Sequence, residues 1–255
     1  MDNLRKVIQH YGAENIAALL MEPVNGSSGG AIYPPEGYWV ETQKILIEND
    51  ILLIADEVMT GFGRTGFKFS CEDYEIKPDI MIAGKGMSSG YAAISGTYST
   101  DKIANSIMDA GYLVMFHTFA ALPLSCAAAN SVLQILRREK LCEKVAPLGE
   151  RLKQKLNGAL GQHPLVAEIR GKGLLIGIEI VKDKEKLISF DEQERITDQI
   201  INKGLEEGVL LYPGGTGEYR DIICLGPPYI IGEEEIDLIV ATLGKVLNHI
   251  QVKYN

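Results

Sequence analysis

The sequence has few of the features that mark a secreted or membrane protein. Its four cysteines are scattered, and none belongs to a C-x-x-C pair; they are Cys71, Cys126, Cys142 and Cys224. This pattern is typical of reduced thiols in a cytoplasmic protein. No apolar run approaches the roughly 20 residues that a membrane span needs. The first residues are charged and amphipathic and lack an apolar signal core. We therefore expect a cytoplasmic protein with no membrane partner.

Positive charge is also scarce. Lys and Arg number 25 against 34 Asp and Glu, which gives a formal net charge of −9. This balance argues against a nucleic-acid partner, because phosphates repel a negative surface. We expect no metal site either. Glycine, in contrast, is frequent, with 27 residues, and the excess falls in loops around the stretch from 51 to 90.

That stretch contains two short apolar runs, each followed by a charged residue. The run Ile51–Ala55 leads to Asp56, and the run 79–83 leads to Lys85. Both runs have the length and composition of buried strands in a parallel sheet. The ligand site of such a sheet lies beyond the carboxyl ends of its strands. We therefore expect the Asp56 carboxylate and the Lys85 amine at the same edge of one sheet.

An amine and an acid at one site suggest a particular chemistry. Lys85 lies between Gly84 and Gly86, so little crowds its amine, and such a lysine can form a Schiff base with a carbonyl. Asp56 can pair with a ring nitrogen that must stay protonated. Pyridoxal 5'-phosphate needs both groups. The alternative is that Asp56 caps a turn and Lys85 is a solvated loop residue; the paired placement favours the cofactor.

The same residues resemble a known family. The matching segments occur in the family's order along nearly the whole chain. They are Glu22-Pro23, Asp56-Glu57-Val58, Gly61–Gly66, Pro78-Asp79-Ile80, Gly84-Lys85-Gly86, His117-Thr118-Phe119, Arg170–Leu174 and Pro227-Pro228. As a set they are similar to the signature of class III (omega-type) pyridoxal-phosphate-dependent aminotransferases. The resemblance implies a fold-type I transferase, with Lys85 and Asp56 as catalytic residues.

The resemblance also implies roles for two further cofactor-binding residues. Val58 would stack on one face of the pyridine ring, although as an apolar residue near a strand it is equally suited to the core. Thr118 would bind the cofactor phosphate, whereas its position near the start of a helix expected over 121–138 is also that of an ordinary N-cap. In the family this threonine comes from the neighbouring subunit, which implies a homodimer.

The segment Gly61–Gly66 has a competing interpretation. It fits the G-x-G-x-x-G pattern of dinucleotide-binding proteins and follows a strand. That function requires a helix to begin there, so that its N-terminus holds the pyrophosphate. The residues that follow show no helical pattern. We expect the glycines to form a tight loop beside the cofactor.

The sequence says less about the residues that bind the substrate than about those that bind the cofactor. A substrate carboxylate usually pairs with an arginine. Family members that act on ornithine-like substrates carry arginine three residues before the Pro-Pro pair, where this chain has Cys224. Arg220 is the candidate for this role, with a solvated loop arginine as the alternative. Glu22 is a second candidate, with a structural salt bridge as the alternative.

The rest of the pattern predicts two domains. Residues 1–140 alternate strands and helices and correspond to part of a large cofactor-binding domain with a mainly parallel α/β sheet. Residues 141–255 mix helices and strands as in a small C-terminal α+β domain. The loop 25–30 is expected to be mobile at the site edge. Family members are much longer, so we expect an incomplete large domain that lacks the family's N-terminal part.

We therefore expect transamination of an amino acid or amine with a 2-oxo acid. Two alternatives remain open from the sequence. One is another reaction of the same fold, an aminomutase or a decarboxylase. The other is an inactive remnant of an aminotransferase that survives as a binding protein. The expected partners are the small-molecule amino donor and acceptor, together with a second copy of the chain or a separate N-terminal half.

Overall fold

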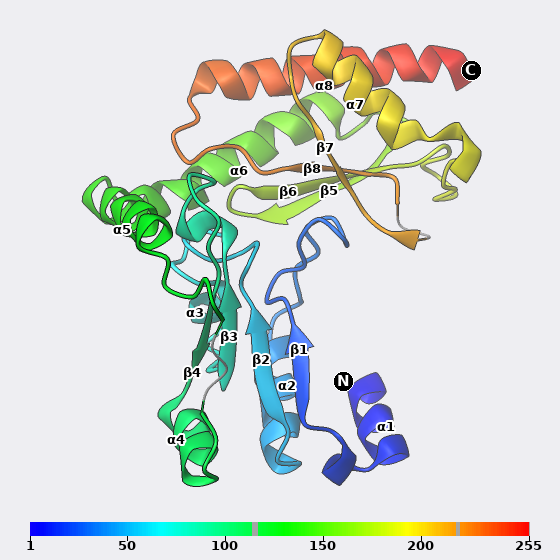
Figure 1. Cartoon of the computed structure of the whole chain (residues 1–255). Coiled ribbons are helices and arrows are strands. Elements are labelled where there is room, and N and C mark those ends of the chain that lie inside the picture. Colours follow the sequence, from blue (N-terminus) through cyan, green and yellow to red (C-terminus); the bar gives the residue numbers. More distant parts are fainter. Residues whose placement is uncertain (114–116, 218–219, 255) are drawn as a thin grey trace. The chain divides into compact units, whose positions relative to one another are not determined.

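The structure is a computed structural model that describes residues 1–113, 117–217 and 220–254 (Figure 1). The chain forms two compact units, each with its own sheet. Unit 1 consists of Met1–Pro23, Pro34–Gly63 and Phe67–Cys142. Unit 2 consists of Val24–Tyr33, Arg64–Gly66 and Glu143–Asn255. Two short segments from the first half of the chain therefore belong to the second unit.

Unit 1 is built on a four-stranded sheet in the order β1-β2-β3-β4. The strands are β1 (Ala18–Met21), β2 (Leu52–Asp56), β3 (Ile80–Ala83) and β4 (Gly96–Ser99). The pairs β1–β2 and β2–β3 are parallel, and β3–β4 is antiparallel. The sheet is thus mainly parallel, as the apolar runs predict. The carboxyl ends of β1, β2 and β3 lie at one edge.

The sheet of unit 1 is accompanied by several helices. They are α1 (Asp2–Tyr11), α2 (Tyr38–Glu48), α3 (Ser70–Asp73), α4 (Asp101–Asp109) and α5 (Pro123–Arg138), with short 3₁₀ turns η1 (Ala13–Asn15) and η2 (Lys85–Met87). Trp39, Ile45 and Leu46 of α2 are buried with Leu53 and Ala55 of β2. Each such side chain contributes about 1.5–3 kcal/mol relative to an exposed position. This burial holds β2, and the residues after it, in place.

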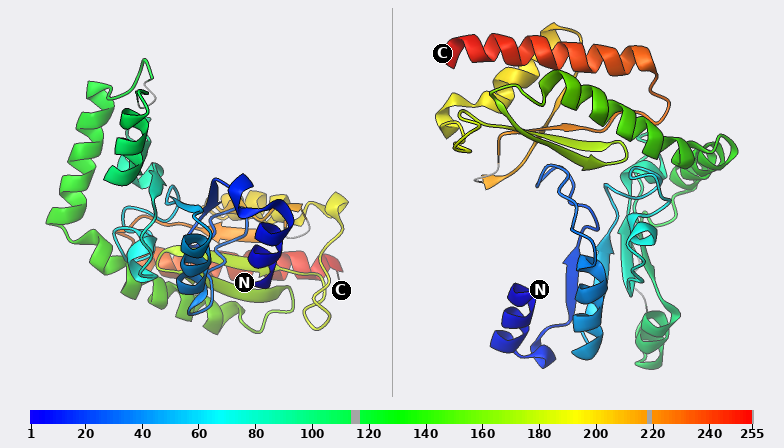
Figure 2. Two further views of the ribbon diagram at one scale, coloured as in Figure 1. Left: turned by 90° about the horizontal axis from the view of Figure 1, so that it is seen from below. Right: turned by 180° about the vertical axis from the view of Figure 1, so that it is seen from behind.

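Unit 2 has an antiparallel sheet in the order β5-β6-β8-β7. Its strands are β5 (Val166–Lys172), β6 (Leu175–Ile180), β7 (Tyr212–Gly214) and β8 (Ile222–Leu225). Its helices are α6 (Leu141–Leu160), α7 (Ile196–Glu206) and α8 (Glu233–Tyr254), with the 3₁₀ turn η3 (Glu192–Glu194). The three helices lie on one face of the sheet and share one apolar core with it (Figures 1 and 2). This is the small α+β unit that the sequence predicts.

The loop between β1 and α2 differs from its prediction. We expected residues 25–30 to be mobile, but four consecutive carbonyl groups of this loop accept hydrogen bonds within unit 2. Gly215 N donates to Ser27 O over 2.7 Å, Thr216 Oγ1 to Ser28 O over 3.3 Å, and Arg170 to Gly29 O and Gly30 O. The loop is therefore docked.

Close packing under this loop explains a glycine in the middle of β6. A Cβ atom added at Gly177 would lie 2.1 Å from the carbonyl oxygen of Gly30. Because backbone cannot give way cheaply at such a distance, only glycine fits here. Within the described ranges, no helix combines the length and the apolar character that a bilayer crossing requires.

Candidate active site

Three acidic or basic residues follow the carboxyl ends of neighbouring parallel strands. Glu22 follows β1, Asp56 ends β2, and Lys85 lies two residues beyond β3. The register places Asp56 opposite Ile82, and Glu57 N donates to Ile82 O over 2.8 Å. The structure therefore brings Glu22, Asp56 and Lys85 to one edge of the sheet in unit 1. This is the edge at which open α/β sheets bind ligands.

The Asp56 carboxylate is held by the turn that follows it. Its Oδ1 atom accepts a hydrogen bond of 2.9 Å from the backbone N–H of Val58, two residues on. Asp56 is half-buried, and its Oδ2 atom has no hydrogen-bond partner among the described residues. The hydrogen bond to Oδ1 thus fixes the carboxylate, and Oδ2 can still accept a hydrogen bond from another donor. Val58 is half-buried on the same turn.

Glu57 is a buried acid that organises this turn, and its role was not predicted from the sequence. Its side chain accepts hydrogen bonds from Thr60 Oγ1 and, over 2.7 Å, from the backbone N–H of Cys71 in α3. Its carbonyl accepts from Gly61 N over 2.8 Å. Hydrogen bonds to a charged group contribute about 1.5–3 kcal/mol each. Glu57 therefore ties the end of β2 to α3 and sets the conformation of residues 57–61.

Lys85 begins the short turn η2, and its side chain is exposed. Its backbone has φ 36°, in the left-handed region that non-glycine residues seldom adopt. The next residue, Gly86, packs against the loop after β2: a Cβ atom there would lie 3.1 Å from Phe62 Cβ and 3.3 Å from Gly61 O. The Lys85 Nζ atom lies against the sulfur of Met59. Lys85 is therefore fixed against the turn that carries Asp56.

Thr118 lies before the helix whose start was expected to position it. The helix α5 begins at Pro123 with Leu122 as its N-cap, so Thr118 is not the N-cap residue. It is exposed in a turn in which Ala120 N donates to His117 O over 2.8 Å. Residues 114–116, just before this turn, lie outside the described ranges. A phosphate-binding role for Thr118 stays a prediction.

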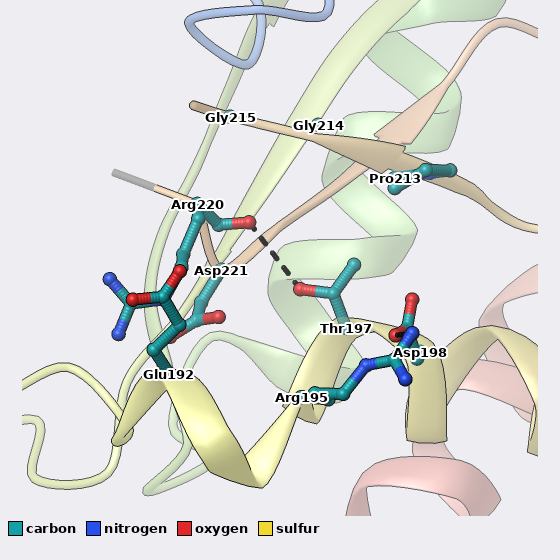
Figure 3. A pocket seen from close by; sticks show the side chains of 9 residues that line it. All are labelled: Glu192, Arg195, Thr197, Asp198, Pro213, Gly214, Gly215, Arg220 and Asp221. Carbon is teal, nitrogen blue, oxygen red and sulfur yellow. Dashed lines mark hydrogen bonds and ion pairs between the residues drawn. The ribbon is translucent and has the colours of Figure 1, made fainter. Parts of the chain in front are cut away.

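Arg220 belongs to unit 2, whereas Glu22, Asp56 and Lys85 belong to unit 1. It is a half-buried loop residue whose guanidinium donates to Phe190 O over 2.9 Å and to Gly217 O over 3.3 Å. It borders a hollow of about 240 Å³ at the start of α7, and its carbonyl accepts from Thr197 Oγ1 (Figure 3). Both terminal nitrogens of its guanidinium thus donate to backbone carbonyl groups of unit 2.

The groups whose pKa is raised by burial include two cysteines and an aspartate. Burial raises the pKa of the Cys224 thiol to about 11, although the nearby Arg170 opposes the shift. Burial, reinforced by Glu57, also raises the pKa of the Cys71 thiol. Burial raises the pKa of Asp221, which borders the same hollow as Arg220. Cys224 is therefore a neutral, buried thiol and cannot replace an arginine that binds a carboxylate.

In the part of the chain that the structure describes, no three His, Cys, Asp or Glu side chains are grouped so that they could hold a metal ion. The groups on the sheet edge fit a different cofactor. A half-buried carboxylate with one free acceptor and an amine on the neighbouring strand end match the needs of pyridoxal phosphate, which takes an acid at its ring nitrogen and a lysine at its aldehyde.

Comparison with known proteins identifies the family. Residues 1–247 match the sequence profile of the family Aminotransferase class-III, and the chain belongs to this family. It is 35% identical over 250 residues to "Uncharacterized aminotransferase YodT" of Bacillus subtilis (strain 168), which covers 96% of this chain and 56% of that protein. It is 36% identical over 252 residues to a putrescine–pyruvate aminotransferase of Pseudomonas aeruginosa, covering 97% and 53%.

Solved structures of transaminases also resemble this chain. An amine transaminase from an uncultivated Pseudomonas species, described in its PLP-bound form, superimposes with a TM-score of 0.90 at 33% identity. The match covers 97% of this chain and 55% of that one. The fold is thus that of the PLP-dependent transaminases. The chain spans little more than half the length of these relatives.

Proposed function

We propose that this chain carries the catalytic lysine and acid of a pyridoxal-phosphate-dependent transaminase, which transfers an amino group from an amino acid or amine to a 2-oxo acid. The observation that carries the proposal is the placement of Lys85 and Asp56. They follow adjacent parallel strands and meet at the ligand-binding edge of one sheet. Membership of the class-III family and the PLP-bound state of a similar structure support the same conclusion.

Each residue of the edge has a defined task in this proposal. Lys85 Nζ would hold the cofactor when it is bound and, once free, would move a proton from the substrate carbon that carries the amino group. Asp56 Oδ2 accepts a hydrogen bond from the protonated ring nitrogen. The bound cofactor supplies an electron sink for the charge left on that carbon. Val58, on the same turn as Asp56, covers a face of the ring, and Thr118 binds the phosphate.

Two residues are candidates for substrate binding, and each is considered within its own unit. Glu22 lies at the same sheet edge as Asp56 and Lys85, where it can face an amino donor. Arg220 is the proposed carboxylate-binding residue of unit 2, although this role requires its guanidinium to leave the carbonyls of Phe190 and Gly217. Relatives are named for putrescine, taurine and diaminobutyrate as donors. The donor of this protein is an amine or amino acid of that general class.

The proposed assembly is a homodimer in which Thr118 serves the partner's site, or a complex with a separate N-terminal half. The proposed location is the cytoplasm, where the four free cysteines stay reduced.

A screen of amino donors against two acceptors tests the proposed function. Amino acids, diamines and taurine are offered to the chain, alone and together with the product of the neighbouring reading frame, with pyruvate or 2-oxoglutarate as acceptor. We expect at least one donor to yield alanine or glutamate in stoichiometric amount with its own aldehyde or keto acid. Release of carbon dioxide without amino transfer, or no reaction in any arm, contradicts transamination.

A further inference from the structure

The side chain of Phe62 packs against the turn that carries Lys85. Phe62 belongs to the loop after β2 and Lys85 to the turn after β3, and both residues lie in unit 1. Phe62 is 8% exposed and shares a buried apolar cluster with Ala83, the last residue of β3, and Met87, the last residue of η2. The cluster therefore includes one residue on each side of Lys85 in the sequence.

The contact is closest at Gly86, the residue after Lys85. A Cβ atom at Gly86 would lie 3.1 Å from Phe62 Cβ and 3.3 Å from Gly61 O. These distances are tighter than ordinary van der Waals contacts, so a larger residue would have to displace one of the two loops. Glycine at position 86 thus lets the backbone of the turn approach the Phe62 side chain directly.

The backbone is strained on both sides of this contact. Phe62 has φ 59° and Lys85 has φ 36°, in the left-handed region that non-glycine residues seldom adopt. Such residues persist only where the surrounding structure holds them. Two hydrogen bonds close the turn on itself. Met87 N donates to Gly84 O over 2.9 Å. Ser89 N donates to Lys85 O over 3.0 Å. The packing on Phe62 fixes the closed turn relative to the loop after β2.

The Phe62 ring is itself held in place by other apolar residues of unit 1. It meets the ring of Phe69 edge to face, with centroids 5.2 Å apart and planes at 64°. Ala129 and Leu136 of α5 belong to the same apolar cluster. The ring is therefore a fixed surface on which the turn after β3 can rest.

We propose that Phe62 is a positioning residue whose buried side chain supports η2 and thereby sets the place of the Lys85 amine at the sheet edge. The inference rests on the proposed function, because the place of the amine matters only if Lys85 reacts with an aldehyde. Phe62 takes part in no bond formation and acts through the backbone of Gly86. A reacting group that is displaced by about 1 Å can lose two orders of magnitude in rate.

The test measures how fast Lys85 reacts with pyridoxal phosphate. The protein is incubated with this aldehyde and reduced with borohydride at intervals, and peptide mass spectrometry compares Lys85 with the other lysines of the same sample. Hydrogen exchange at the Ser89 amide, which donates to Lys85 O, reports on the turn without any cofactor. Phe62→Ala removes the ring, and Phe62→Leu keeps part of its apolar volume. Phe190→Leu is the matched control, because Phe190 is a buried ring in the core of unit 2.

We expect Phe62→Ala to slow modification of Lys85 by about 10-fold and Phe62→Leu by about 2- to 3-fold, because rate falls steeply when a reacting group is displaced. The Ser89 amide should exchange faster in the same order. Phe190→Leu should lower the thermal stability of the protein and leave the Lys85 rate unchanged. A role of Phe62 in stability alone would give the same result as this control and would contradict the inference.

A second set of variants tests the contact between Phe62 and Gly86 directly. Gly86→Ala adds a methyl group toward Phe62 Cβ and should slow modification of Lys85 by about 10-fold. Phe62→Gly removes that Cβ atom and tolerates the positive φ. In the double variant the added methyl group has more space, so Gly86→Ala should cost little further rate. Gly158→Ala is the control, because a Cβ atom there meets nothing within 4 Å. Equal effects of Gly86→Ala in both backgrounds would show that the two residues act independently, contrary to the inference.

The outcomes separate the inference from the proposed function. If Lys85 of the wild-type chain reacts and the Phe62 and Gly86 variants react equally fast, the Phe62 inference is wrong and the proposed function stands. If Lys85 of the wild-type chain never reacts, the proposed function fails and the inference fails with it.

Discussion

Replacement of Lys85 by alanine is expected to abolish turnover and to remove the borohydride-trapped adduct at residue 85. The amine is the covalent attachment point and the group that moves the substrate proton in the proposed function. General acid–base catalysis alone contributes about 10²- to 10⁴-fold, and the covalent step is lost in addition. The measurement is amino transfer to a 2-oxo acid, combined with peptide mass spectrometry after reduction.

Two further variants separate this effect from misfolding. Lys85→Arg keeps the positive charge and the length of the side chain, but its guanidinium does not lose a proton and cannot react with the aldehyde. It should be as inactive as Lys85→Ala. Lys77→Ala changes an exposed lysine at the opposite end of β3 and should behave as the wild type. Turnover by either residue-85 variant, or a trapped adduct on another lysine, would exclude the assignment.

Replacement of Asp56 by asparagine should lower turnover by about 10- to 10³-fold and leave weak cofactor binding. An adjacent carboxylate raises the pKa of a cation by about one to three units. Asparagine keeps the hydrogen bond from Val58 N but removes the negative charge, so the protonated fraction of the ring nitrogen falls by a similar factor. Steady-state rates and cofactor titration measure the two effects separately.

Asp50→Asn is the matched control for this change. Asp50 is exposed just before the amino end of β2, with φ 53°, a conformation that asparagine also tolerates. This variant should retain normal rates. An Asp56→Asn protein with the same rate as the control would show that the Asp56 charge does not act on the ring.

Apolar patterning predicted most of the regular structure, because buried strands and amphipathic helices have periods that are local in sequence. The run Ile51–Ala55 corresponds to β2, and the helix expected over 121–138 corresponds to α5 (Pro123–Arg138). The short helices α3 and α4 were not predicted. The four residues of α3 are too few to show a period, and the Glu57 carboxylate that accepts from its Cys71 N–H comes from a distant position in the sequence.

Contacts between residues far apart in the sequence account for the other differences between the predicted and the observed structure. The loop after β1 contains the small polar residues of a mobile segment, yet Arg170 and the chain around residue 215 bind its carbonyl groups. No local signal in a Gly-Ser sequence reveals acceptors in another part of the fold. The role of Glu57 depends on contact between the end of β2 and α3, where the Cys71 N–H donates to its side chain. Asp56 and Lys85 could be marked from the strand pattern alone, because strand ends in a parallel sheet are recognisable, whereas Val58 and Thr118 were marked only through the resemblance to a family.

The central claim is that Lys85 and Asp56 act on opposite ends of one aromatic ring. A crystal structure of the protein reduced with borohydride in the presence of pyridoxal phosphate tests it most directly. We expect continuous density from Lys85 Nζ to the cofactor, with an Asp56 oxygen about 3 Å from the ring nitrogen. A cofactor attached to a different lysine, or an Asp56 carboxylate turned away from the ring, would contradict the account.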